Sequence, residues 1–175
     1  MILLISSLYA QDASAPAEKT YDPLPEGFNS ILLGLSMEQT KDILKEDDNF
    51  YYRGDPDVSL QSRPNESSLD VEGLGYVYRG IFQYYEDILY IIIIMIDPEK
   101  MDHYTMFTHL TGKYGPPDQF SPDKSVWKQD GKMLVLERPV TLKYIDEQIF
   151  TELVGESEAE KSLESELRED FINQF

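Results

Sequence analysis

The pattern of apolar and polar positions is clearest between Ile81 and Pro117, where it predicts two strands, a tight turn and a helix. Every residue from Ile88 to Ile96 is apolar, and Glu86-Asp87 separates this run from the strand before it. A strand that is apolar on both faces is typical of the middle of a sheet. We therefore expect Ile88–Ile96 to be a central strand of an antiparallel hairpin.

Two helices are predicted beside this hairpin. Ser36 and Gln39 form a capping-box pattern ahead of a helix at about residues 37–45. Asp97 is predicted to be the N-cap of the second helix, with Pro98 in its first turn. The expected buried positions are Met37, Thr40, Ile43 and Leu44 in the first helix, and Met101, Tyr104, Phe107 and Leu110 in the second.

Three more strands are predicted at Val126–Lys128, Met133–Leu136 and Val140–Tyr144, the first two joined by a turn at Asp130-Gly131. Pro139 indicates an edge strand or a bulge, because proline cannot donate to a sheet. The fold class expected is therefore α+β. It comprises an antiparallel sheet built from two helix-plus-strands units, with helices on one face and an amphipathic helix at the C-terminus.

The composition divides the chain into three parts. Residues 1–27 are predicted to be a signal-like segment and flexible linker, because an apolar run up to Ala10 precedes Ala- and Pro-rich residues. Residues 28–154 form the single α+β domain, and residues 155–175 an acidic amphipathic helix. This organisation predicts a periplasmic or secreted protein, although a chance apolar run at the N-terminus would look the same.

The C-terminal segment carries apolar residues at every fourth position from Leu163, namely Leu163, Leu167, Phe171 and Phe175. Such spacing gives one connected stripe on a helix. A short acidic helix is marginal in water, so packing must stabilise it. We expect the stripe to bind either its own domain or a partner protein.

Charge and composition exclude several functions. The formal net charge is −18, which disfavours nucleic acid and anionic membrane surfaces. The absence of cysteine excludes disulfides and thiolate chemistry. No segment has the ~20 apolar residues that a membrane-spanning helix needs.

Candidate chemistry is sparse. His103 and His109 are six residues apart, a spacing that places them on different helix faces. Asp55 to Glu66 partly matches a calcium loop, but Leu60 replaces the glycine needed for its sharp turn. We expect no catalytic residue, cofactor or metal ligand, while cation binding by this loop stays open. The alternative is a small hydrolase that uses carboxylates among Asp47, Asp48, Asp55 and Asp57, or a binder of small ligands.

Tyrosines are frequent in the predicted strands: Tyr51, Tyr52, Tyr76, Tyr78, Tyr84, Tyr85 and Tyr90. A tyrosine offers apolar area with a polar tip, so this set could line a recognition surface. Tyrosine is also common at half-buried sheet positions, which is the interpretation we favour.

The segment Gly34-Leu-Ser-Met-Glu-Gln-Thr-Lys-Asp-Ile-Leu44 resembles the helix start of small bacterial envelope proteins of the BamE/SmpA–OmlA and β-lactamase-inhibitor-protein-like group. The second helix, Lys113-Tyr-Gly-Pro-Pro117 and Trp127 resemble the second unit of those proteins, so the resemblance spans about residues 28–145. It implies a non-catalytic periplasmic binding or scaffolding protein whose partner is another envelope protein, and it carries over no catalytic residue.

Overall fold

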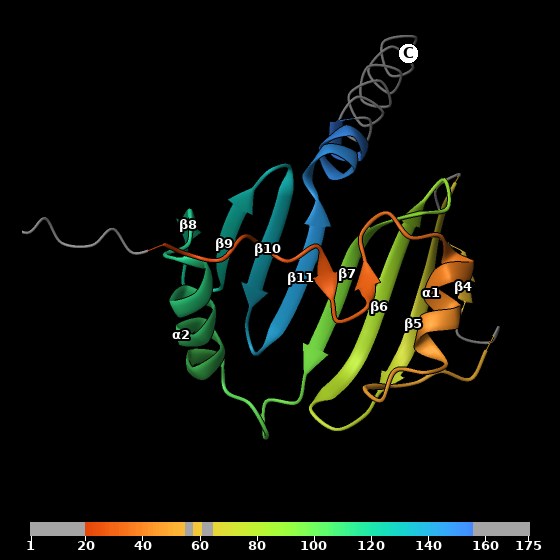
Figure 1. Ribbon diagram of the computed structural model, residues 1–175, viewed down its shortest axis with the longest axis horizontal. Helices are drawn as coiled ribbons and strands as arrows, with labels where there is room; N and C mark the ends of the chain where they lie inside the picture. Colours follow the sequence, from red (N-terminus) through yellow and green to blue (C-terminus); the bar gives the residue numbers. More distant parts are fainter. Residues whose placement is uncertain (1–19, 55–57, 61–64, 156–175) are drawn as a thin grey trace, which may run out of the picture.

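The computed structural model describes residues 20–54, 58–60 and 65–155 of the chain. They form an α+β domain built on an antiparallel sheet, as predicted, and this sheet has nine strands beside a small two-stranded sheet (Figure 1). The large sheet contains β3 (Phe50–Tyr51), β4 (Val58–Leu60), β5 (Glu66–Gly73), β6 (Val77–Tyr85), β7 (Ile88–Ile96), β8 (Gln119–Phe120), β9 (Lys124–Gln129), β10 (Lys132–Glu137) and β11 (Thr141–Asp146). The small sheet pairs β1 (Gly27–Phe28) with β2 (Ile31–Leu32), and the helices are α1 (Met37–Leu44), α2 (His103–Tyr114) and a helix over residues 147–155.

Two helix-plus-strands units meet in the middle of the sheet. The strand order is β3-β5-β6-β7-β11-β10-β9-β8, with β4 paired to β5 off this path. In each unit a helix precedes a meander of three long strands, and the last strands of the two meanders, β7 and β11, pair with each other. The prediction that Ile88–Ile96 is a central strand is confirmed, because β7 covers that range and has a long strand on each side.

The start of α1 confirms the capping box. The Ser36 hydroxyl accepts from the Gln39 amide at 3.2 Å, and the Gln39 side chain accepts from the Ser36 amide at 2.9 Å. Two otherwise unpaired amides are thus satisfied. The predicted inner face is also confirmed, since Thr40 and Leu44 are buried and the two other predicted residues pack against the core.

The start of α2 differs from the prediction. Its N-cap is Asp102, whose carboxylate accepts hydrogen bonds from the Thr105 amide at 2.9 Å and the Thr105 hydroxyl at 2.6 Å. Asp97 instead closes a single preceding turn by accepting from the Glu99 amide at 3.0 Å. Leu110 is buried and Met101 and Phe107 pack against the core, as predicted, whereas Tyr104 is 73% exposed rather than buried.

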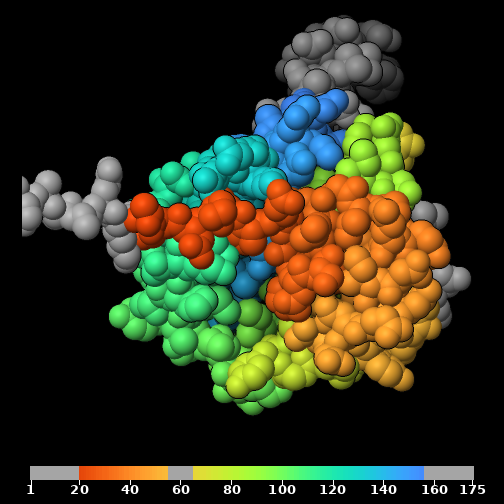
Figure 2. All heavy atoms as spheres, in the orientation of Figure 1, coloured from red at the N-terminus to blue at the C-terminus, as the bar shows by residue number. Residues whose placement is uncertain are grey.

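The core lies mainly between the sheet and its helical face. Leu89, Ile92, Ile94 and Ile96 of β7 point into this layer, which α1, α2 and the N-terminal segment cover (Figure 2). The other face holds a smaller cluster around Tyr90 and Ile91 of β7, Ile145 of β11 and Leu153 of the C-terminal helix. Both faces of β7 are therefore covered, which explains its uninterrupted apolar run.

Residues 20–26 belong to the domain rather than to a flexible linker. The Asp22 amide donates to the Lys113 carbonyl at 2.9 Å, and the Leu24 amide donates to the Gln129 side chain at 2.7 Å. This segment crosses in front of the sheet from α2 towards β1 (Figure 1). The ordered domain therefore begins before the predicted boundary at residue 28, because hydrogen bonds to the end of α2 and to β9 hold this segment.

The hairpin turns follow their sequence signals, with one exception. Asp130 and Gly131 both have positive φ, as the predicted two-residue turn requires. Pro139, in contrast, lies in the turn before β11, and β11 pairs with strands on both sides without a register shift. The expectation of an edge strand or bulge at Pro139 is wrong, because the proline precedes the ladder and removes no donor from it.

The C-terminal helix begins at residue 147, directly after β11 and ahead of the predicted boundary at 155. Its Leu153 is 6% exposed, and Ile149 and Phe150 pack against the smaller core cluster. The stripe Leu163, Leu167, Phe171 and Phe175 lies outside the described residues. No helix in the described part of the chain is long and apolar enough to cross a membrane.

Candidate functional site: a tyrosine-lined end of the sheet

Of the carboxylates named for the alternative hydrolase, the structure describes Asp47 and Asp48. The Asp47 carboxylate accepts from the amide and side chain of Asn49, both at 2.8 Å, and Asp48 is exposed. Asp55 and Asp57 lie outside the described residues. Among the residues that the structure describes, no group of three or more His, Asp or Glu side chains could hold a metal ion.

The tyrosines of the sheet divide into three groups, of which Tyr52 and Tyr85 are half-buried, as predicted. Tyr84 is fully buried and Tyr90 is 7% exposed, so these two side chains belong to the core. Tyr51, Tyr76 and Tyr78 are 54%, 61% and 64% exposed. The interpretation of the whole set as half-buried sheet residues is therefore wrong for the two core tyrosines and for these three exposed ones.

The three exposed tyrosines come from neighbouring elements at one end of the sheet. Tyr51 lies on β3 opposite Glu72 of β5, while Tyr76 and Tyr78 follow the turn into β6. Leu74 in that turn is 43% exposed. We call the set Tyr51, Leu74, Tyr76 and Tyr78 the tyrosine end.

A register shift explains why Tyr78 points away from the core. Val77 pairs with Ile96 and Arg79 pairs with Met95, so Tyr78 is an extra residue in the β6–β7 ladder. A bulge of this kind redirects a side chain and often lies beside a functional site. The sequence gives a partial signal for this end, because tyrosine and valine alternate in Tyr76-Val77-Tyr78, directly after Gly73 and Gly75.

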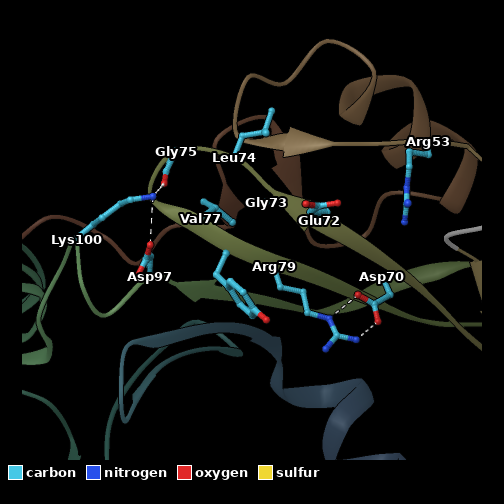
Figure 3. A pocket seen from close by; sticks show the side chains of 11 residues that line it. Arg53, Asp70, Glu72, Gly73, Leu74, Gly75, Val77, Arg79, Asp97 and Lys100 are labelled. Carbon is cyan, nitrogen blue, oxygen red and sulfur yellow. Dashed lines mark hydrogen bonds and ion pairs between the residues drawn. The ribbon is translucent and has the colours of Figure 1, made fainter.

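A shallow depression of about 690 Å³ opens at the tyrosine end, and Leu74 and Tyr78 are part of its lining (Figure 3). Six charged residues also line it, three of each sign: Arg53, Arg79, Lys100, Asp70, Glu72 and Asp97. The depression is therefore polar, with Leu74, Val77 and the Tyr78 ring as the apolar part of its lining. It lies near the β5–β6 turn and the loop that follows β7.

Two of the cations are fixed by neighbouring acceptors (Figure 3). Arg79 forms a two-pronged ion pair with Asp70, in which Nε lies 2.6 Å from Oδ1 and Nη2 contacts Oδ2. Lys100 Nζ donates to the Gly75 carbonyl at 2.7 Å and lies 3.2 Å from Asp97 Oδ2. The Glu99 amide and then Lys100 lower the pKa of Asp97, which keeps this carboxylate ionised.

Glu72 is different from the other acids of the depression. Among the described residues no cation pairs with it, and Figure 3 shows its carboxylate apart from the Arg79–Asp70 pair. Its side chain is exposed on the strand between Tyr51 and Arg79. The arrangement offers a negative group and aromatic faces to solvent, which suits binding to another molecule.

The two histidines take separate positions, as their spacing predicted. His109 is exposed, whereas Nε2 of His103 is buried and has no hydrogen-bond partner among the described residues. Burial, and then the positive charge of Arg138, lowers the pKa of His103 below its ordinary value of 6.5.

This shift predicts a pH dependence of stability. Because folding lowers the pKa of His103, the unfolded chain binds a proton on this side chain at a higher pH than the folded protein does. The free energy of unfolding therefore falls as the pH drops below about 6.5 towards the pKa of His103 in the folded protein. We expect His103→Gln to flatten this part of the pH profile in urea unfolding followed by circular dichroism. His109→Gln is the matched control and should leave the slope unchanged; equal effects of the two changes would contradict the assignment.

These features define a class: an α+β domain with a two-unit antiparallel sheet and an exposed aromatic end. Residues 26–156 match the family model described as the TP0088 domain, so the chain belongs to the TP0088 domain family. No curated protein and no solved structure matches the chain.

Proposed function

We propose that this protein is a non-catalytic binding or scaffolding protein of the bacterial envelope, and that it acts through protein–protein contacts at the tyrosine end. The observation that carries the proposal is the grouping of three exposed tyrosines and Leu74 at one end of the sheet, where Leu74 and Tyr78 line a depression. Tyrosine is enriched at protein interfaces, where its ring loses little conformational freedom and its hydroxyl still finds a polar partner.

The charged residues of the depression support binding more than chemistry. Arg79 is held by Asp70, Lys100 is held by Asp97 and the Gly75 carbonyl, and Asp97 has a lowered pKa. A carboxylate that acts as a general acid needs a raised pKa instead. Nothing in the described residues indicates catalysis.

The envelope location rests on the N-terminal apolar run and on the resemblance to the BamE/SmpA–OmlA and β-lactamase-inhibitor-protein-like group. The partner proposed on this basis is another envelope protein. The C-terminal stripe of Leu163, Leu167, Phe171 and Phe175 remains a second proposed contact, either with its own domain or with that partner.

Affinity capture from the periplasmic fraction tests the proposal with a matched pair of variants. Tyr51→Ala combined with Tyr78→Ala should reduce recovery of a stoichiometric partner about tenfold or more, because aromatic contacts dominate many interfaces. Tyr104→Ala removes an equally exposed tyrosine from α2 and should leave recovery unchanged.

All three side chains are exposed, so the variants should keep the melting temperature of the parent. That measurement separates loss of contact from loss of fold. Recovery of the same partner by the parent and by the tyrosine variant would contradict the proposed function.

A further inference from the structure

We infer that the tyrosine end binds a cationic protein segment, whose lysine or arginine side chains lie against the tyrosine rings and Glu72. This inference rests on the proposed function and adds the chemistry of the partner. The inference depends on which charged side chains at this end already form ion pairs and which do not.

Two of the three positive groups of the depression are held by acceptors within it. Arg79 is held by both oxygens of Asp70, and Lys100 by Asp97 and the Gly75 carbonyl. An acidic partner would have to break these contacts before gaining new ones. Charge-assisted hydrogen bonds of the two-pronged kind are among the stronger polar interactions, so this exchange is unfavourable.

Among the acids of the depression, Asp70 and Asp97 are engaged in these same pairs, and Glu72 is in the opposite situation. The Glu72 carboxylate is exposed and pairs with no cation in the described part of the chain. A further acidic loop borders the tyrosine end, because the Leu74 amide donates to the Asn49 carbonyl at 2.7 Å. Glu46 and Asp48 of that loop are exposed. A cationic segment would therefore meet unpaired negative charge at the rim.

The aromatic rings favour the same partner. A lysine or arginine placed over a tyrosine face is attracted by the ring electrons, by about 0.5–1 kcal/mol at exposed sites. Tyr51 lies directly across from Glu72 on adjacent strands, so one cation can contact both. The net charge of −18 also accelerates encounter with positive segments and repels a second copy of the chain.

Two synthetic peptides test this inference by NMR titration of the full chain: one alternates arginine with leucine, and the other replaces each arginine with glutamate. We expect the arginine peptide to bind and to shift amide signals of Tyr51 and of residues 72–79. The glutamate peptide should cause no shifts there.

Charge variants separate a specific site from general attraction to an acidic protein. Glu72→Gln should weaken binding of the arginine peptide about threefold, as expected for an exposed ion pair. Glu152→Gln removes the same charge from an exposed position on the C-terminal helix and should have a smaller effect. Equal effects of the two changes, or equal binding of both peptides, would overturn the inference.

Binding assays with the captured cellular partner distinguish failure of this inference from failure of the proposed function. If the captured partner depends on Tyr51 and Tyr78 but is insensitive to Glu72→Gln and to salt, the inference fails and the proposed function stands. If no partner depends on the tyrosines, the proposed function fails. If both the tyrosines and Glu72 are needed and salt weakens binding, both are supported.

Discussion

Trp127→Ala is expected to lower the free energy of unfolding by about 3–5 kcal/mol, the usual cost of removing a large buried aromatic side chain. Trp127 is 2% exposed and lies in the main core, with its ring centroid 6.2 Å from that of Phe107 on α2. Its indole Nε1 donates to the Gly115 carbonyl at 2.8 Å, which holds the end of α2 against β9. The substitution therefore leaves a cavity and removes a buried hydrogen bond.

Urea unfolding followed by circular dichroism measures this change, since the variant has no tryptophan fluorescence. Trp127→Phe keeps most of the ring but loses the donor, so it should cost less, about 1–3 kcal/mol. Phe120→Ala is the control, because Phe120 is 70% exposed and should contribute little. A loss under 1 kcal/mol for Trp127→Ala would show that this side chain does not join α2 to the sheet.

Gly80→Ala is expected to destabilise the domain by about 1–3 kcal/mol through overpacking. A Cβ at this position would lie 2.5 Å from Cε1 of Phe50, which is 4% exposed. The Phe50 ring packs edge-on against Phe28 and Phe82, with centroids 6.0 and 5.6 Å away, so it has little room to move. The glycine thus provides space on β6 for an aromatic ring from β3.

Gly112→Ala is the matched control, since a Cβ there would meet nothing within 4 Å and the residue lies inside α2. Alanine favours helix over glycine by about 1 kcal/mol, so this variant should be neutral or more stable. Phe50→Leu should recover part of the loss in the Gly80→Ala background, because it shortens the side chain that clashes. Equal melting temperatures for Gly80→Ala and the parent would contradict this packing.

Local signals explain why much of the fold can be predicted from sequence. The apolar run of β7, the Ser36–Gln39 capping box and the Asp130-Gly131 turn each depend on neighbouring residues, and the structure confirms all three. The start of α2 could not be predicted in the same way. Asp97 and Asp102 are both suitable N-caps, and the hydroxyl of Thr105 favours the second.

The candidate site depends on tertiary contacts that sequence patterns do not contain. The exposure of Tyr78 follows from a bulge in the β6–β7 ladder, and Tyr51 reaches the same end through pairing of β3 with β5. Tyr84 is buried and Tyr78 is exposed, but the alternating sequence pattern of the strand does not distinguish them. Register and pairing decide between them, and both are long-range properties.

A photo-crosslinking residue placed at position 78 tests the central claim most directly, with position 104 as the matched control. Both positions carry exposed tyrosines, on β6 and on α2 respectively. Illumination of intact cells followed by mass spectrometry then identifies what lies against each position. We predict one crosslinked envelope protein from position 78 and none from position 104. The absence of a crosslink at position 78, or the same products from both positions, would contradict a binding function at the tyrosine end.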